Sequence, residues 1–534
     1  MNPTFGRKAE HATILLGEQV SDSRIRPTAE WYCKLFSYSK EKKSIMNKQI
    51  KAWSFSLMAA CTLAACQNTT VPLDGRIDVP QQFSQAEAAR GSAEIGRWWQ
   101  SWHDPVLSAL VEQGLQQSPD VQIAVSRLNE ARATSRMARA DLGPQAGLSG
   151  SAGIVRGNVD NPLNDNTRAL PGQFPQTAGL TDGSQDIKGN SLLGGASASW
   201  EPDIFGGKRS DADAAAYAAL GVQEQLYGAQ MLVAGDIADH YFSARAAQKR
   251  LQTASQNIAV MQRMAQYVQG RFQAGQATRY EVNEVQSRLA AVRAQQSTIQ
   301  SEYDAAARAI AVLTGQTPQS FRLPESSVNV LAQQPAAPEG QTPQGMLERR
   351  PDIRAHAAQV NAYAAKLASA KADLLPRFTI NFLGQGGRIE VDGDSALKGW
   401  GSLLSVGIQM PIFTNGRIQA NIAAADARLQ TALLQYDQTV LRALGEVDNA
   451  YQAQAALERQ NRLLADAQQQ AARQAADAQK LFRHGNKTLD EALRAQLGEQ
   501  EMADNLTRSQ LARAQMTVNL YKALGGGWNE MQTP

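Results

Sequence analysis

The residue types that most often support catalysis or metal binding are scattered along this chain of 534 residues. Its five histidines stand at positions 11, 103, 240, 356 and 484, and its three cysteines at positions 33, 61 and 66. The sequence has no Cys and His set with the spacing of a zinc site, and no Gly-Lys-Ser or Gly-Lys-Thr loop that would hold a nucleotide phosphate. We therefore expect no enzymatic activity, no metal site and no cofactor.

Cys66 is the residue whose surroundings predict covalent chemistry. Residues 46–51 form a short basic stretch, residues 52–65 carry no charge, and Leu63-Ala64-Ala65 stands directly before the cysteine. This order is typical of a bacterial lipoprotein signal, which is cut before the cysteine so that acyl chains can be attached to it. We therefore expect lipidation at Cys66, a true start at Met46, and a weaker competing site at Met58-Ala59-Ala60-Cys61.

Residues 1–65, the expected extension and signal peptide, also carry the basic excess of the sequence. They hold 10 Lys and Arg against 5 Asp and Glu, so the net charge falls from +3 for the whole chain to −2 for residues 66–534. This balance gives no reason to expect nucleic acid as a partner. Residues 66–104 are expected to be a lipid-anchored tether that ends in Trp98, Trp99 and Trp102. We expect these tryptophans to dock the tether on the protein, although a membrane interface would also suit them.

The remaining chain contains a duplication with a period of more than 200 residues. Such a period is too long for a solenoid repeat and indicates two half-structures. We place the first repeat at 105–315, a linker at 316–343, the second repeat at 344–528 and a tail at 529–534. The matching segments are Ser118-Pro119-Asp120 with Arg350-Pro351-Asp352, Ile204-Phe205 with Ile412-Phe413, and Phe272-Gln273-Ala274-Gly275 with Phe482-Arg483-His484-Gly485.

Long helices account for most of each repeat. Asp104-Pro105 is a typical helix start and predicts one helix to about Asp141. The stretch 207–272 predicts a helix about 100 Å long, followed by an antiparallel partner over 278–314. Apolar residues with heptad spacing support the first hairpin and a thinner second one. They are Leu251, Ala254, Ile258, Met261, Ala265, Val268 and Phe272 in the first, and Leu464, Ala471, Ala475, Ala478 and Phe482 in the second.

Four strands are expected, two in each repeat. Residues 146–155 and 191–200 precede the first long helix, and residues 377–382 and 405–410 alternate apolar with polar in the second repeat. Such strands suit a membrane barrel with an apolar face toward lipid and a small or polar face inward. Aromatic residues at the strand ends would form its girdle: Trp200, Phe205, Trp400 and Phe413.

The number of strands sets the expected assembly. Four strands cannot close a barrel, a dimer would give a barrel filled by side chains, and a trimer would give twelve strands around a lumen. We therefore predict a mainly α-helical chain with a β-barrel portion. Its homotrimer would form a 12-stranded barrel in the outer membrane and an α-helical tunnel in the periplasm.

Several short motifs in this order resemble the TolC-like outer membrane factors, in particular the NodT-type outer membrane lipoproteins of resistance–nodulation–division efflux systems. The resemblance covers roughly residues 66–530. The motifs are Trp98-Trp99, Asp104-Pro105, Leu107, Leu110-Val111, Ser118-Pro119-Asp120 and Leu524-Gly525-Gly526-Gly527-Trp528.

The resemblance implies a passive exit duct of a tripartite efflux pump. Such a duct works with a periplasmic adaptor (a membrane fusion protein) and an inner-membrane pump, and has no catalytic centre. Two alternatives remain open: a duct for protein secretion, and a non-transporting structural lipoprotein of the outer membrane. The exported cargo, whether drug, metal or aromatic acid, is also left open.

The same resemblance implies roles for the two hairpin tips. The adaptor-docking turns fall on Gly275, Gln276, Ala277 and Thr278, and on Gly485, Asn486, Lys487 and Thr488. A helix-ending Gly followed by a capping Thr would explain the same residues structurally. The periplasmic gate falls on Glu491, with Lys487 and Phe482 beside it. Arg494 stands where the family has a second acid, so a Glu491–Arg494 pair is expected either to latch the gate or to be an ordinary solvated helix pair.

Overall fold

The computed structural model describes residues 71–73, 76–159, 185–391 and 397–528. The chain divides into Met1–Cys66 and Gln67–Pro534, and the description below concerns the second unit. The expected signal, Met46, Cys66, the loop between the first two strands and the tail at 529–534 lie outside the described residues.

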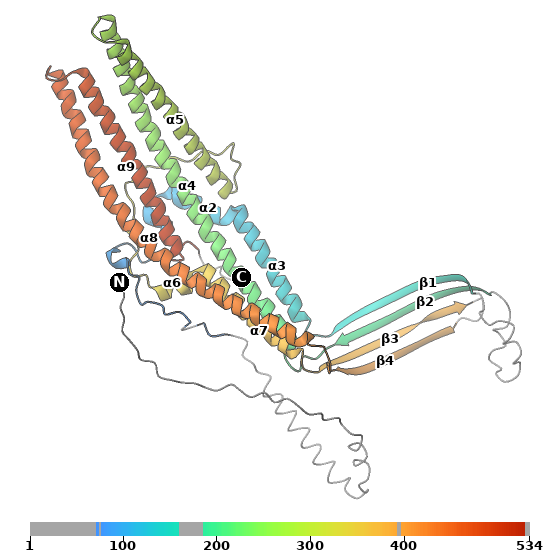
Figure 1. The fold of residues 1–534 in the computed structure, drawn as a ribbon. Coiled ribbons are helices and arrows are strands. Elements are labelled where there is room, and N and C mark those ends of the chain that lie inside the picture. The colour runs from blue at the N-terminus through green and yellow to red at the C-terminus, as the bar shows by residue number, and fades with distance from the viewer. Residues whose placement is uncertain (1–70, 74–75, 160–184, 392–396, 529–534) are drawn as a thin grey trace, which may run out of the picture. The chain divides into compact units, whose positions relative to one another are not determined.

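The duplication is confirmed by helices of matched length (Figure 1). The long helices α4 (Gly207–Gln273) and α8 (Arg417–Arg483) have 67 residues each. Their hairpin partners α5 (Arg279–Leu313) and α9 (Leu489–Ala523) have 35 residues each. The helices that precede the strands, α3 (Pro119–Ala140) and α7 (Pro351–Ala372), have 22 residues each. Within the described ranges, no helix is both long and apolar enough to be a membrane span.

The single helix predicted from Asp104 to Asp141 is wrong. The chain forms α2 (Pro105–Gln117) and α3, with Ser118 between them at φ −58° and ψ 131°. Proline lacks an N–H and keeps the preceding residue out of the α region, so Pro119 ends one helix and begins another. The second repeat has the same break at Arg350-Pro351, between α6 (Pro343–Arg349) and α7.

Both predicted hairpins are present, α4 with α5 and α8 with α9 (Figure 1). All the predicted seam positions of α4 are buried or half-buried, and Val282 and Ile299 of α5 are buried opposite them. In α8 the buried seam residues are small, Ala475 and Ala478, which allows its close approach to α9. Apolar burial along these seams supplies most of the stability of helices this long.

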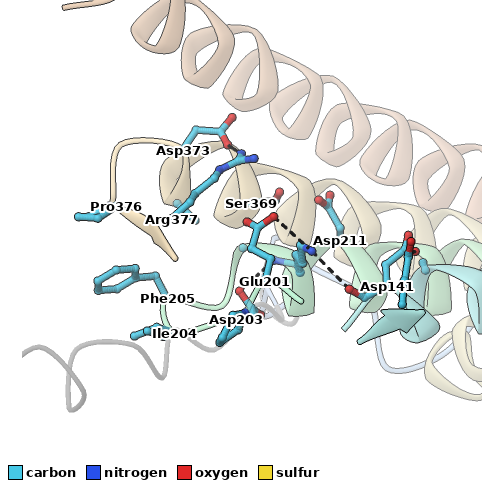
Figure 2. Close-up of a pocket in the computed structure, with 16 residues that line it drawn as sticks. Asp141, Glu201, Asp203, Ile204, Phe205, Asp211, Ser369, Asp373, Pro376 and Arg377 are labelled. Carbon is cyan, nitrogen blue, oxygen red and sulfur yellow. Dashed lines mark hydrogen bonds and ion pairs between the residues drawn. The ribbon is translucent and has the colours of Figure 1, made fainter. Parts of the chain in front are cut away.

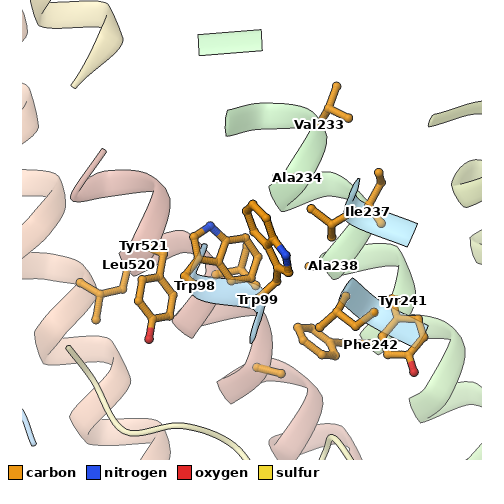
Figure 3. Packing of buried hydrophobic residues seen from close by; sticks show 14 of the residues in the cluster. Trp98, Trp99, Val233, Ala234, Ile237, Ala238, Tyr241, Phe242, Leu520 and Tyr521 are labelled. Atoms are coloured by element: carbon orange, nitrogen blue, oxygen red, sulfur yellow. The ribbon is translucent and has the colours of Figure 1, made fainter. Parts of the chain in front are cut away.

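The tryptophan cluster docks on the protein, as predicted (Figure 3). Trp98, Trp99 and Trp102 lie in a short 3₁₀ helix, Trp98–Trp102, and each is at most 1% exposed. Trp98 stacks on Tyr521 of α9 with ring centres 5.5 Å apart, and Trp102 packs on Phe242 of α4 at 5.1 Å. The end of the tether therefore joins the two halves of the helical core.

The tether before this cluster runs along α7 and α8. The Val71 N–H donates to Asn361 Oδ1 at 3.3 Å, and Arg76 pairs with Asp437 at 2.7 Å. A second short 3₁₀ helix, Ala86–Ala88, follows. These contacts attach the segment to the second repeat before it reaches the tryptophan cluster.

The strands form one antiparallel sheet in the order β1-β2-β3-β4. They are β1 (Gln145–Val159), β2 (Gln185–Trp200), β3 (Arg377–Val391) and β4 (Leu397–Gln409), so they extend beyond the segments predicted from sequence. The two repeats meet where β2 pairs with β3, at Ala198 opposite Phe382 for example. Within the described residues, β1 and β4 each pair with one neighbour only.

Trp98→Ala tests the docked cluster. We expect a loss of about 3–5 kcal/mol in the free energy of unfolding, because a fully buried indole leaves a large cavity between α4 and α9. Trp400→Ala is the matched control, since that side chain is 86% exposed. Denaturation followed by circular dichroism in detergent gives both values, and equal losses would contradict a special role for Trp98.

Candidate functional site: the hairpin tips and the sheet faces

The two hairpin tips share one backbone geometry. Gly275 and Gly485 have φ of 72° and 76°, a left-handed conformation that glycine adopts without a steric penalty. The N–H of Gln276 donates to Arg271 O at 2.8 Å, and that of Asn486 donates to Leu481 O at 2.9 Å. Each long helix therefore ends in a Schellman-type turn.

Each partner helix begins with a capping box. Thr278 accepts from the Glu281 N–H at 3.3 Å and donates its own N–H to Glu281 Oε2 at 2.6 Å. Thr488 and Glu491 repeat this exchange at 3.3 and 2.9 Å. The capping threonines are as predicted, whereas sequence reasoning missed the glutamates, although Thr-x-x-Glu is the usual sign of the motif.

Glu491 therefore performs two tasks in the second tip. One carboxylate oxygen serves the cap, and the other receives the Lys487 ammonium at 3.3 Å. The backbone hydrogen bond from Thr488, then its hydroxyl and Lys487, lower the pKa of Glu491 below its ordinary value. Glu281 also has a lowered pKa, mainly through the Thr278 backbone. Both tips thus keep a negative charge at mildly acidic pH.

The predicted Glu491–Arg494 pair is wrong. Arg494 Nε lies 2.8 Å from Asp490 Oδ2, and this hydrogen bond raises the pKa of Arg494. Glu491 turns back toward the start of the helix to serve the cap, while Asp490 is four residues before Arg494 and on its side. The structure brings together Lys487, Thr488 and Glu491, and separates Arg494 from them.

The start of α9 packs on the first hairpin. Leu493 is 2% exposed and lies in one cluster with Val260, Met264 and Val268 of α4 and Val282 of α5. Leu489 and Leu497 flank it. This contact was missed from sequence, although Leu489, Leu493 and Leu497 repeat every four residues and so mark one helix face.

The two tip phenylalanines differ in their surroundings. Phe272 packs beside this cluster, and the Arg279 guanidinium lies 4.7 Å from its ring centre. Phe482, predicted to restrain the gate, is 37% exposed in the protomer. The two tips thus have the same backbone but different packing.

The sheet has one apolar and one mainly polar face, because residues paired across antiparallel strands point to the same side. The apolar face contains Leu148, Ile154, Leu192, Trp200, Phe378, Ile380, Phe382, Leu404, Val406 and Ile408. The other face contains Ser149, Ser151, Ser191, Ser197, Ser199, Thr379, Asn381, Gln385, Ser405 and Gln409, with Val155, Leu193, Leu383, Ile389 and Leu403 as apolar exceptions. Leu148 is 90% exposed and Val406 is 71% exposed, so the protomer leaves the apolar face uncovered.

The four predicted girdle residues lie at both ends of the strands. Trp200 is the last residue of β2, and its indole N–H donates to Leu142 O at 3.0 Å. The ring centres of Phe205 and Phe378 are 6.4 Å apart. Phe413 follows β4 and is 87% exposed. Trp400 lies near the other end of the sheet, where it is paired with Gly386 of β3. Their role at a membrane interface stays a prediction.

A cavity of about 450 Å³ lies where strands and helices meet (Figure 2). Its carboxylates have structural partners. Asp203 accepts the N–H groups of Lys208 and Arg209 at the start of α4, at 3.1 and 2.7 Å. Glu201 pairs with Lys208 at 3.3 Å, and Asp373 pairs with Arg377. Across the described ranges, no group of three or more His, Cys, Asp or Glu side chains is arranged to hold a metal ion.

Known proteins share this chain's sequence and architecture. OpmQ of Pseudomonas aeruginosa, a pyoverdine export outer membrane protein, is 28% identical over 479 residues, which cover 89% of this chain and 97% of the relative. Nodulation protein T of Rhizobium leguminosarum bv. trifolii is 26% identical, with coverage of 84% and 92%. The solved outer-membrane channel OprN superposes with a TM-score of 0.69 at 27% identity, covering 86% of this chain and 99% of that one.

A sequence profile described as outer membrane efflux protein matches residues 110–316 and 342–526. These matches include both repeats, the four strands and both hairpin tips. The relatives are channel and efflux proteins, and the fold is that of TolC-like outer membrane channels. The chain therefore belongs to the outer membrane efflux protein family.

Proposed function

We propose that this protein is the passive, non-catalytic exit duct of a tripartite efflux pump, and that three copies build it. The observation that carries the proposal is the sheet, whose apolar face is uncovered and whose other face is mainly polar. An apolar exterior around a polar interior suits a closed barrel that spans a bilayer. In a trimer, β1 of one copy would pair with β4 of the next, which gives twelve strands and an open lumen.

The helices also offer a surface for a second copy. Leu434, Leu441 and Leu463 of α8 are 66%, 59% and 71% exposed. Their spacings of 7 and 22 residues place them on one side of the helix. An exposed apolar stripe of this kind favours burial against a neighbouring protomer, as in the wall of a helical tunnel.

The hairpin tips are the proposed contact sites for partner proteins. Gly275 to Thr278 and Gly485 to Thr488 would dock a periplasmic adaptor, and Lys487, Phe482, Glu491 and Arg494 would lie near the gate. An inner-membrane pump, of the resistance–nodulation–division type, would select the cargo. The family's efflux relatives favour this function over protein secretion or a structural role.

The tether supports the proposed lipid anchor at Cys66. Val71 and Leu73 pack against a cluster that includes Val360, Leu367 and Leu429, and α7 ends just before β3. The first described residues after Cys66 are thus attached to the part of α7 and α8 that leads into the sheet. An acylated residue shortly before them would be well placed to enter the same membrane.

Cys66→Ser tests the anchor. Intact mass spectrometry of the membrane-extracted protein should show the wild type without residues 1–65 and with three acyl chains. The Cys66→Ser variant should carry none. Cys61→Ser is the matched control and should be acylated like the wild type; acyl chains that depend on Cys61 instead would contradict the proposal.

Reconstitution tests the duct itself. The purified protein should be a trimer by native mass spectrometry and should give discrete conductance steps in planar bilayers. A monomer, or a trimer without conductance, would favour the structural-lipoprotein alternative. If a strain lacking the gene loses export of a secreted protein but not of small molecules, the secretion alternative holds.

Glu491→Gln tests the gate without removing the cap, because glutamine also completes a capping box. We expect cation selectivity to fall when this charge is lost. Because the pKa of Glu491 is lowered, wild-type selectivity should persist to a lower pH than an ordinary glutamate would allow. The reversal potential across a salt gradient measures both effects.

Glu281→Gln is the matched control for this gate variant. It removes the equivalent carboxylate from the first tip with the same small effect on the cap. Its selectivity should match the wild type. Equal changes in both variants, or none in Glu491→Gln, would show that Glu491 has no special place at the gate.

A further inference from the structure

Basic residues gather at one end of the apolar sheet face, away from the ends that join α3, α4, α7 and α8. Arg156 of β1 is opposite Lys188 of β2, and Arg388 of β3 is opposite Lys398 of β4. By register all four point to the same side as Leu192 and Trp400. Each is exposed. Two acidic residues, Asp186 and Glu390, share this side by register, and the Glu390 carboxylate lies 2.7 Å from the Arg388 guanidinium.

Like charges directly opposite each other on neighbouring strands destabilise a sheet, and Lys398 is directly opposite Arg388, whose guanidinium also pairs with Glu390. An apolar solvent beside them would add to this cost, because a charge loses hydration there. An anion bound between Arg388 and Lys398 would convert their repulsion into attraction.

A groove lies beside the second pair. It has a volume of about 740 Å³ and is lined by Leu192, Gly194, Gly386, Arg388, Lys398 and Trp400, among others. Glycine keeps the floor low: a Cβ at Gly386, which shares this face, would stand 3.2 Å from Trp400 Cβ. The groove therefore has two cations at one side and apolar walls formed by Leu192 and Trp400.

We propose that this groove binds a phosphate-bearing lipid of the outer leaflet. The Arg388 guanidinium and Lys398 ammonium hold the headgroup phosphate, and an acyl chain lies along Leu192 and Trp400. Arginine presents a fork that matches phosphate oxygens, and lysine adds a point charge. On the same side, Arg156 and Lys188 extend the basic rim across β1 and β2.

The inference rests on the proposed function, since it needs the apolar face to meet lipid. It commits to a lipid rather than to free phosphate because the cations border an apolar groove. An indole such as that of Trp400 also favours the boundary between acyl chains and headgroups. Three such sites, one per copy, would fix the height of the barrel in the membrane.

The test uses the full-length trimer and bis-phosphorylated lipid A in native mass spectrometry. We expect up to three lipids bound per trimer. Arg388→Gln with Lys398→Gln should weaken binding by roughly tenfold or more, because two charge-assisted contacts are lost. Arg377→Gln is the matched control: it removes a charge from the opposite end of the same strand and should bind like the wild type.

Two further arms decide the source of the phosphate. The wild-type trimer should bind dephosphorylated lipid A as weakly as the double variant binds the phosphorylated lipid. If the wild type bound both lipids equally well, the site would be an apolar groove that does not recognise phosphate. Inorganic phosphate that displaces the lipid at equal concentration would overturn the lipid assignment. Conductance of the double variant, measured separately, should equal that of the wild type, so loss of the lipid site is distinguished from loss of the duct.

Discussion

Among the described residues of one protomer, the sheet has edge strands without a second neighbour and an apolar face without a covering layer. The rest of the architecture depends on this constraint. Along the outer edges of β1 and β4, N–H and C=O groups have no strand partner among the described residues, and the apolar face has no covering layer. In water such edges lead to aggregation, and in lipid each unpaired group is costly. Closure through further copies solves both problems together.

The two repeats match in helix length and in strand register. The helices α4 and α8 have equal length, α3 and α7 are also equal, and the two strand pairs meet in register between β2 and β3. The tether then locks the two halves together through Trp98 and Tyr521. A duct built from two repeats needs this register. A shift of one residue in the β2–β3 pairing would move every side chain of one strand pair to the other face of the sheet.

The duplicated halves differ in how firmly they are held. Arg250 of α4 bridges Glu302 of α5 at 2.7 Å and Asp504 of α9 at 2.9 Å, so α9 is tied to the first hairpin by charge as well as by Leu493. In contrast, α8 carries exposed leucines, and near its tip its buried seam residues are the small Ala475 and Ala478. Within the protomer, α8 is thus the long helix with the weaker lateral support, and the tip that carries Lys487 and Glu491 begins at its end.

The sequence by itself determined the order of the elements, the lengths of the long helices, the strand alternation, the heptad seams and the tip turns. These features depend on local spacing: Pro and Gly at turns, apolar residues at every second or at every third and fourth position. One exception is Pro119: a single helix was predicted across it, but the chain forms α2 and α3 there. All four strands were also predicted too short, because their Gly- and Ser-rich parts alternate poorly.

Only the tertiary structure decided which partners meet. Glu491 serves its own cap and Lys487 rather than Arg494, because the side chain turns toward free N–H groups at the start of its helix. Leu493 packs on α4 and α5 of the other repeat, and Arg388 is brought opposite Lys398 by strand register. The Leu493 and Arg388 contacts depend on how separate segments approach one another, which spacing along a single sequence does not encode. The Glu491 pairing is local, and its Thr-x-x-Glu motif is present in the sequence.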